Sequence, residues 1–145
     1  MAMQEGPSVS KLMSTDPVTL PANTPLVQAA QCMRDSFIGD VLLTSREGKV
    51  CGIITDRDIA IRCVAEEQDL STVRAGDVCT TGVVSVTPDT SAQEAANLMR
   101  EKAIRRLPVI DDSGKLCGVV SIGDLAEELD PHSALAIIST AAPNN

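Results

Sequence analysis

The chain has 145 residues, a length that suits one compact domain or two small halves sharing a core. Its formal net charge of −8 argues against a nucleic-acid or anionic-membrane partner, because both attract basic surfaces. No apolar run approaches the roughly 18 to 20 residues of a membrane span, and the N-terminus lacks the pattern of a secretory signal. We therefore expect a cytoplasmic protein.

Aliphatic side chains must supply the core, because the chain has no Trp or Tyr and a single Phe, Phe37. The five cysteines form no CxxC pair and mostly lie in apolar runs, so we expect buried, reduced thiols. The single histidine, His132, stands near the C-terminus. A metal centre needs more nitrogen and sulfur ligands than this, so we expect no metal and no cofactor.

The chain is an internal duplication. Residues 12–60 align with residues 78–126 at a constant offset of 66 residues and without a gap. Identical pairs occur along the whole alignment, for example at Ala29, Met33, Ile38, Gly52 and Asp58. We therefore divide the chain into a flexible N-terminus (1–10), repeat 1 (11–66), a linker (67–76), repeat 2 (77–130) and a C-terminal tail (131–145).

Each repeat predicts the order β-α-β-β-α. In repeat 1 an extended segment at 17–20 precedes a helix with its cap signals at Thr24 and Pro25. Strands at 38–44 and 50–55 then form a hairpin, and a second helix covers about 56–65. Repeat 2 has the same elements. An extended segment lies at 83–86, the first helix follows the cap signals at 89–91, the two strands of the hairpin lie at 104–110 and 116–121, and the second helix covers 122–129. Pro131 is expected to end the last helix.

The first helix of each repeat carries apolar residues on more than one side. In repeat 1 these include Leu26, Val27 and Cys32, which leave little purely polar face. Such a helix must bury a second side against another surface. We therefore predict a homodimer built from these helices and from the helices that begin near Asp58 and Asp124.

One heptapeptide occurs twice and is the best candidate for a functional site: GIITDRD at 52–58 and GVVSIGD at 118–124. Each is an apolar strand that ends at a hydroxyl residue and opens a helix, with an Asp three positions on. Such a turn combines a hydroxyl, a carboxylate and free helix N–H groups, which suits a ribose diol with a nearby phosphate. The same S/T-x-x-D pattern is also a capping box, which satisfies the backbone and needs no ligand.

The sequence contains no recognisable catalytic constellation. Nucleophilic catalysis would need a Ser or Cys beside a His base, and the P-loop pattern GxxxxGK[ST] does not occur. We therefore do not expect an enzyme. A nucleotide-sensing regulatory module is favoured, with a ligand-free dimerisation scaffold as the alternative and a small-molecule enzyme as a third hypothesis.

The β-α-β-β-α order, the doubled h-x-x-T/S-x-x-D signature and the IRRLPVID strand resemble a tandem pair of CBS domains. The similarity extends over about residues 9–128 and is to the small stand-alone bacterial CBS-pair proteins. It implies an α+β fold whose two sheets pack together about a pseudo-twofold axis, with the helices outside and two equivalent clefts between the repeats. It further implies a dimer, an adenosine nucleotide (AMP, ADP, ATP or a related adenosyl compound) as regulatory ligand, and action in trans on an unknown effector protein.

The resemblance also assigns residues to the two clefts. It implies one cleft formed by Ile53, Thr55 and Asp58 of repeat 1 with Val84, Ile104, Arg105 and Arg106 of repeat 2. It implies a second cleft formed by Val119, Ser121 and Asp124 of repeat 2 with Val18, Ile38, Gly39 and Asp40 of repeat 1. The apolar members would enclose the purine, and each Asp would bind the ribose.

The repeats diverge at the cleft positions where a phosphate would lie. Repeat 2 has Arg105 and Arg106 where repeat 1 has Gly39 and Asp40. Guanidinium groups bind phosphate, whereas a carboxylate repels it. We therefore predict that a phosphorylated adenosine prefers the Asp58 cleft. The alternatives are that the two arginines form a solvated strand edge and that Asp40 is a plain surface charge.

Overall fold

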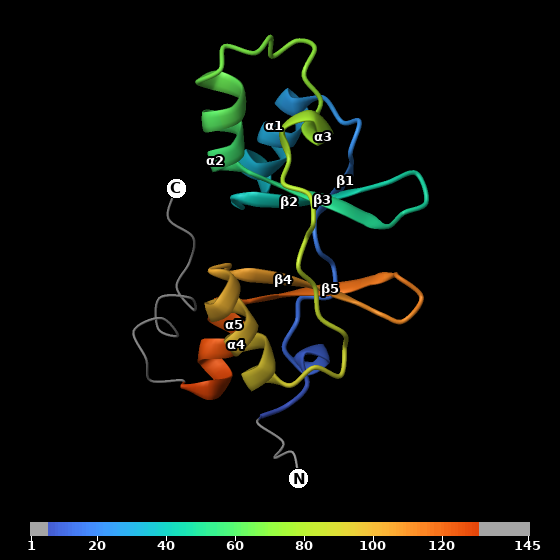
Figure 1. Ribbon diagram of the computed structural model, residues 1–145, viewed down its shortest axis with the longest axis vertical. Helices are drawn as coiled ribbons and strands as arrows, with labels where there is room; N and C mark the ends of the chain where they lie inside the picture. Colours follow the sequence, from blue (N-terminus) through green and yellow to red (C-terminus); the bar gives the residue numbers. More distant parts are fainter. Residues whose placement is uncertain (1–5, 131–145) are drawn as a thin grey trace. The chain divides into compact units, whose positions relative to one another are not determined.

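The computed structural model describes residues 6–130, which form two compact units, each centred on one repeat (Figure 1). The repeat-1 unit consists of residues 18–83. The repeat-2 unit consists of residues 84–130 together with residues 6–17. The predicted tail, with Pro131 and His132, lies outside the described residues. Both units mix helices with small sheets, so the predicted α+β class is confirmed.

The repeat-1 unit contains a three-stranded sheet in the order β1-β2-β3. β1 (Thr19–Pro21) runs parallel to β2 (Asp40–Thr44), and β3 (Val50–Thr55) pairs antiparallel with β2. In Figure 1, α1 and α2 lie on the same side of this sheet. The helices are α1 (Leu26–Ser36), α2 (Asp56–Asp58) and α3 (Ala75–Val78).

The repeat-2 unit contains the hairpin of β4 (Arg106–Ile110) and β5 (Leu116–Ser121), with α4 (Ala92–Lys102) and α5 (Ile122–Leu129). The strand predicted at 83–86 is reduced to one parallel bridge between Val86 and Val109. Proline explains the loss. In repeat 1, Leu42 N donates to Val18 O, but the corresponding residue of repeat 2 is Pro108, which has no N–H.

Aliphatic side chains fill a separate core in each unit, as the composition predicts. Leu26, Leu43 and Ile54 are fully buried in the repeat-1 unit, and Leu107 and Leu125 are fully buried in the repeat-2 unit. The second helices of the two repeats differ more from each other than the two cores do. α5 is a regular α-helix, whereas α2 continues as a π-helical segment, Ile59–Val64, where one continuous α-helix was predicted. None of the helices in residues 6–130 has the length and apolar character needed to cross a bilayer.

The segment that precedes each repeat folds onto the other repeat. Val9 lies in a 3₁₀ helix, Val9–Lys11, is fully buried, and donates its N–H to Thr90 O at 2.8 Å. Its counterpart in the linker, Ala75, is also fully buried and donates to Thr24 O at 2.8 Å. Residues 6–10 therefore belong to the repeat-2 unit, where the sequence analysis placed a flexible N-terminus.

Two glycines allow these segments to lie against the sheets. Ser14 pairs with Val119 of β5, and a Cβ at the neighbouring Gly118 would lie 2.5 Å from Ser14 O. A Cβ at Gly52, the equivalent position of β3, would lie 2.7 Å from Cys79 Sγ. Two segments cross the sheets here, residues 9–14 at β5 and residues 75–80 at β3, and we call them the crossing segments. Contacts this short show that a side chain at either glycine would require the neighbouring crossing segment to move.

Candidate functional site

The two heptapeptide turns have the same geometry and both form complete capping boxes. Thr55 Oγ1 accepts from Asp58 N at 3.0 Å, and Asp58 Oδ2 accepts from Thr55 N at 3.0 Å. In repeat 2, Ser121 Oγ accepts from Asp124 N at 3.1 Å, and Asp124 Oδ2 accepts from Ser121 N at 2.9 Å. The backbone-capping role predicted from the pattern is therefore present in both repeats.

The capping box uses only some of the hydrogen-bonding groups of the hydroxyl and carboxylate side chains in each turn. The Thr55 and Ser121 hydroxyls act as acceptors in it, so each retains an O–H that can donate. Each Asp uses Oδ2 in the box. Among the described residues, Asp124 Oδ1 accepts no hydrogen bond, whereas Asp58 Oδ1 lies 3.6 Å from Arg62 Nε. A hydroxyl donor and a carboxylate acceptor thus remain at the turn of repeat 2.

Arg62 makes the two turns electrostatically different. It stands one helical turn after Asp58, and its Nη1 also donates to Val78 O at 3.1 Å, which ties the π-helical segment to α3. The corresponding residue in repeat 2 is Glu128, an exposed carboxylate. The sequence analysis missed Arg62, although the i, i+4 spacing from Asp58 indicates such a pair.

Each turn lies beside the helix-to-strand corner of its own repeat. Asp56 N donates to Gly39 O at 2.9 Å, and Ile122 N donates to Arg105 O at 2.8 Å. In the strand register, Asp40 is the partner of Thr55 and Arg106 is the partner of Ser121. Within a repeat, a carboxylate therefore neighbours the Thr55 turn and a guanidinium neighbours the Ser121 turn.

The apolar residues assigned to the clefts lie at these corners and on the adjoining strands. Those that are half-buried are Ile38, Ile53, Val84, Ile104 and Val119, whereas Val18 is exposed. Gly39, Arg105 and Arg106 are exposed and Asp40 is half-buried. The predicted grouping of Asp58 with Arg106, and of Asp124 with Asp40, joins the two units and stays a prediction.

The thiols near the Asp58 turn depart from the expected burial. All five cysteines are free, and Cys63 is buried as predicted, but Cys51 is exposed, so the prediction is wrong there. Partial burial raises the pKa of the Cys79 thiol, and the neighbouring Cys51 and Asp58 raise it further. Cys79 is therefore a poor nucleophile at neutral pH.

Within the described residues, neither hydroxyl turn lies beside an imidazole or a group of metal ligands. Residues 6–130 contain no histidine, so neither Thr55 nor Ser121 has an imidazole base beside it. Across the same residues, no three His, Cys, Asp or Glu side chains gather closely enough to hold a metal ion. The arrangement is suited to binding a neutral or anionic polar molecule.

Comparison with known proteins agrees with this geometry. A family model of the CBS domain matches the chain twice, over residues 9–65 and 75–131. These matches begin at Val9 and Ala75, the two buried residues that open the crossing segments. The CBS domain-containing protein YhcV of Bacillus subtilis is 34% identical over 139 residues, which cover 95% of this chain and 97% of that protein.

Two solved structures with bound ligands have a similar fold. A CBS domain protein from Pyrobaculum aerophilum, complexed with AMP, has a TM-score of 0.75 and 29% identity, covering 92% of this chain and 99% of that one. The CBS domain pair of protein MJ0100, in complex with 5′-methylthioadenosine and S-adenosyl-L-methionine, has a TM-score of 0.75 and 25% identity. That match covers 85% of this chain and 95% of that one. With two matched domains and a relative similar over nearly its full length, the chain belongs to the CBS domain family, as a tandem CBS pair.

Proposed function

We propose that this CBS pair is a regulatory sensor that binds an adenosine nucleotide, or a related adenosyl ligand, and acts in trans on a separate effector protein. The observation that carries the proposal is the strand-to-helix turn of the heptapeptide, which occurs once in each repeat. After the capping box is complete, Ser121 still has a hydroxyl donor and Asp124 a carboxylate oxygen to offer a ribose diol. The ligands of the two similar structures share an adenosine, which supports the choice of ligand class.

The capping and ligand-binding roles are compatible, because they use different atoms of the same side chains. An Asp whose Oδ2 accepts from the backbone N–H of the N-cap residue is held in one rotamer, so its Oδ1 is oriented before a ligand arrives. Preorganisation of this kind lowers the entropic cost of binding. The ligand-free scaffold remains the alternative, and it requires only the capping box.

The charges around the two turns favour unequal ligand sites. Arg62 lies near the Asp58 carboxylate, whereas Glu128 occupies the equivalent position after Asp124. Arg62 thus adds a cation near Asp58, although within a repeat Asp40 is the strand partner of Thr55 and Arg106 that of Ser121. The phosphate preference therefore rests on the predicted grouping of each turn with the corner of the other repeat. We retain the proposal that a phosphorylated adenosine prefers the cleft of Asp58, with Arg105 and Arg106, and that the Asp124 cleft takes a less anionic ligand.

Titration calorimetry with AMP and adenosine tests the ligand proposal. Asp58→Ala should weaken AMP binding by about 1.5–3 kcal/mol, the range for hydrogen bonds to a charged group. Asp77→Ala is the matched control, because Asp77 caps α3 by accepting from Arg74 N at 2.9 Å and belongs to neither heptapeptide turn. Both variants should lose about 1 kcal/mol of stability through the lost cap, but only Asp58→Ala should lose affinity. Absence of AMP binding to the wild-type protein would favour the ligand-free scaffold.

The same titration tests the inequality of the sites. Arg106→Ala should weaken binding of AMP far more than binding of adenosine, and added salt should narrow the difference between the two ligands. Two indistinguishable AMP sites per chain would contradict the proposed inequality.

A further inference from the structure

The carboxylate of Asp58 is more deeply covered than its counterpart in repeat 2. Asp58 is 9% exposed, whereas Asp124 is half-buried. Both side chains make the same capping bonds, so the capping box does not explain the difference. Arg62 Nε lies 3.6 Å from Asp58 Oδ1, and Glu128 stands at the equivalent position of repeat 2. Arg62 therefore lies against the carboxylate oxygen that the capping box does not use.

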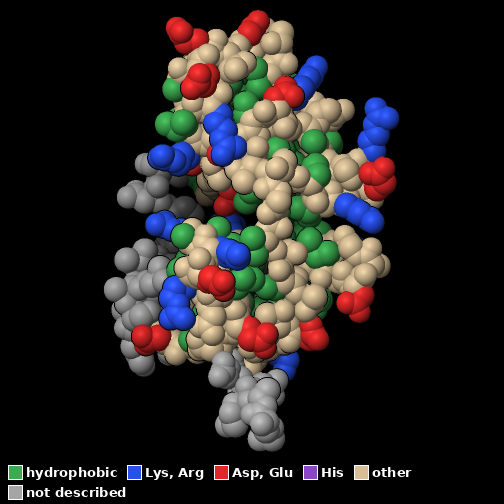
Figure 2. All heavy atoms as spheres, in the orientation of Figure 1, with side chains coloured by type: hydrophobic (Ala, Val, Ile, Leu, Met, Phe, Trp, Pro, Cys, Tyr) green, Lys and Arg blue, Asp and Glu red, His purple; other side chains and the backbone are tan. Residues whose placement is uncertain are grey.

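A second contact holds Arg62 in place. Its Nη1 donates to Val78 O at 3.1 Å, and Val78 is the last residue of α3. The donors of a planar guanidinium point in different directions, so one side chain can bridge the Asp58 carboxylate and the α3 backbone. The Arg62 side chain is nevertheless 48% exposed, and Figure 2 shows basic side chains on the surface of the repeat-1 unit where α2 lies. The guanidinium can therefore move without unpacking the core.

The backbone that carries Arg62 is irregular. Ile59–Val64 is π-helical, and Ala65 N donates to Ala60 O, five residues earlier, at 2.9 Å. Short π-helical segments are rare and occur frequently at functional sites. In repeat 2, residues 125–129, which correspond to 59–63, belong to the regular α-helix α5. The departure from the duplicated pattern therefore falls on the segment that presents Arg62 to Asp58.

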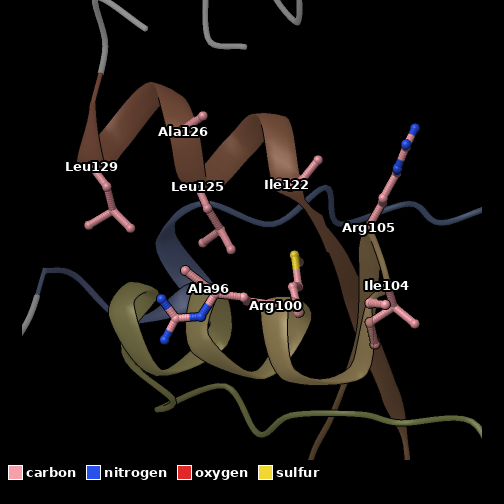
Figure 3. A pocket seen from close by; sticks show the side chains of 10 residues that line it. Ala96, Arg100, Ile104, Arg105, Ile122, Leu125, Ala126 and Leu129 are labelled. Atoms are coloured by element: carbon pink, nitrogen blue, oxygen red, sulfur yellow. The ribbon is translucent and has the colours of Figure 1, made fainter.

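Repeat 2 leaves its carboxylate more open. In α5, Ile122, Leu125 and Leu129 line a groove of about 510 Å³ beside α4 (Figure 3). This apolar stripe fixes the face of α5 that packs toward α4, and Glu128 lies off the stripe and is exposed. Residues four apart lie on the same face of an α-helix, so Glu128 presents a like charge to Asp124. Like charges repel, so Glu128 does not cover Asp124.

Access to the carboxylate, and not its hydrogen-bonding capacity, distinguishes the two turns as ribose sites. A carboxylate oxygen has two lone pairs, so Asp58 Oδ1 has capacity for a ribose hydroxyl even with Arg62 nearby. A diol, however, must bring its hydroxyls within about 3 Å of the carboxylate, and an exposure of 9% leaves little carboxylate surface for them to reach. A ribose at Asp58 must therefore push Arg62 aside.

We propose that Arg62 is a displaceable counterion that gates the Asp58 site and lowers its affinity for a ribose. The inference rests on the proposed function, because it concerns the same site, and it adds a residue that sets ligand affinity there. In the ligand-free protein, Arg62 neutralises and covers Asp58. When a ribose binds, its hydroxyls take the place of the guanidinium at Oδ1, and the guanidinium moves toward solvent.

A phosphate contact is the alternative role for Arg62, and the two roles predict different effects on two ligands. An arginine that binds phosphate strengthens the binding of AMP and leaves the binding of adenosine unchanged. A gating arginine weakens the binding of both ligands by the same factor, because both carry the same ribose. The burial of Asp58 favours the gate, since Arg62 lies against the carboxylate itself.

Titration calorimetry in an Asp124→Ala background tests the gate, because only the Asp58 site then keeps its carboxylate. Arg62→Met removes the charge and the donors but keeps an unbranched side chain. It should strengthen the binding of adenosine and of AMP by the same factor, about two- to fivefold, the effect expected for a half-exposed ion pair. Arg62→Lys, whose single nitrogen cannot bridge Asp58 and Val78, should give a smaller gain.

Two controls separate the gate from indirect effects. Arg46→Met removes an exposed cation from the hairpin turn of repeat 1 and should leave both affinities unchanged. Arg62→Met combined with Asp58→Ala should bind no more tightly than Asp58→Ala alone, because Arg62 acts through Asp58. Arg62→Met should also lower the melting temperature while it raises affinity, whereas a purely structural role would lower both.

Salt provides an independent readout with a neutral ligand. Added salt screens the ion pair between Arg62 and Asp58, so the Asp124→Ala protein should bind adenosine slightly more tightly as the salt concentration rises. The same protein with Arg62→Met should show no such trend.

Three results would overturn the proposal. Unchanged or weaker adenosine binding by Arg62→Met would show that Arg62 is no gate and would leave the nucleotide proposal intact. A loss of affinity confined to AMP would make Arg62 a phosphate contact. Absence of adenosine and AMP binding in the wild type and in every variant would overturn the nucleotide proposal and the gate with it. The first two results require measurable binding, so failure of the gate is distinguishable from failure of the proposed function.

Discussion

The two repeats agree in their backbone hydrogen bonds and in the aliphatic character of their cores, and they differ at exposed positions. Both keep the capping box, the hairpin and the glycine under the crossing segment. They differ at Phe37 and Ala103, at Arg62 and Glu128, and in the form of the second helix. The comparison indicates that the fold is duplicated, whereas the exposed side chains of the two halves are individual.

The crossing segments offer the largest effect on stability. Gly118→Ala places a Cβ 2.5 Å from the backbone oxygen of Ser14, whereas Gly52→Ala places it 2.7 Å from the side-chain sulfur of Cys79. A side chain can move more easily than a backbone. We expect Gly118→Ala to cost about 2–3 kcal/mol of unfolding free energy and Gly52→Ala about 1–2 kcal/mol. Urea denaturation of both variants measures the difference, and equal costs would contradict this view of the segments.

Removal of Arg62 should destabilise repeat 1 without a counterpart in repeat 2. Arg62→Ala loses the bond to Val78 O and the ion pair with Asp58, and we expect a cost of about 1 kcal/mol. Glu128→Ala at the equivalent position should change stability by less than about 0.5 kcal/mol. Thermal unfolding of the two variants provides the comparison. A cost for Glu128→Ala that matches that of Arg62→Ala would show that the Arg62 contacts are not the cause.

The first helix of each repeat ends at a residue in the left-handed conformation, and glycine at that position in repeat 2 should increase stability. Ala103 adopts φ of 56°, a conformation that costs about 1 kcal/mol for a residue with a Cβ. Ala103→Gly should therefore stabilise the protein by up to about 1 kcal/mol. Asn97→Gly, an exposed position in the middle of α4, is the control and should destabilise it by about 0.5–1 kcal/mol. Chemical denaturation checks both signs.

The hairpin turns should differ slightly in their response to acid. Asp111 accepts hydrogen bonds from Ser113 Oγ, Ser113 N and Lys115 N, and these bonds lower the pKa of its carboxyl group. The stability that they contribute is present above the ordinary aspartate pKa, near 4, and is lost as the pH falls through the lowered folded-state value. The equivalent residue of repeat 1 is Ser45, which does not titrate.

An NMR pH titration of the amides in the two turns measures this difference. The Ser113 and Lys115 amides should shift below pH 4, with a midpoint below that of an unperturbed aspartate. The amides of the repeat-1 turn should show no corresponding shift from position 45, because Ser45 has no carboxyl group. A midpoint at or above the ordinary value would show that these bonds do not hold the carboxylate.

Short-range sequence patterns determined many of the strands and helices of this protein. The strands at 50–55 and 116–121 and the helix at 122–129 have the predicted bounds, because β-branched runs, the hydroxyl residue and the capping Asp act over a few neighbouring positions. The 66-residue offset determined that two equivalent units exist and that two equivalent turns lie within them. The candidate residues of each turn followed from the same short-range signals.

Tertiary structure decided the features that depend on distant residues. Val9 is buried in the core of the repeat-2 unit and donates its N–H to Thr90 O. Pro108 has no N–H at the position where Leu42 of repeat 1 donates to Val18 O, so the strand before α4 loses that bond. Cys51 is exposed although its run is apolar, since alternate residues of an edge strand face opposite sides. The groove lined by Ala103, Leu125 and Leu129 likewise exists only once α4 and α5 pack together, because its walls come from two helices that are distant in the sequence.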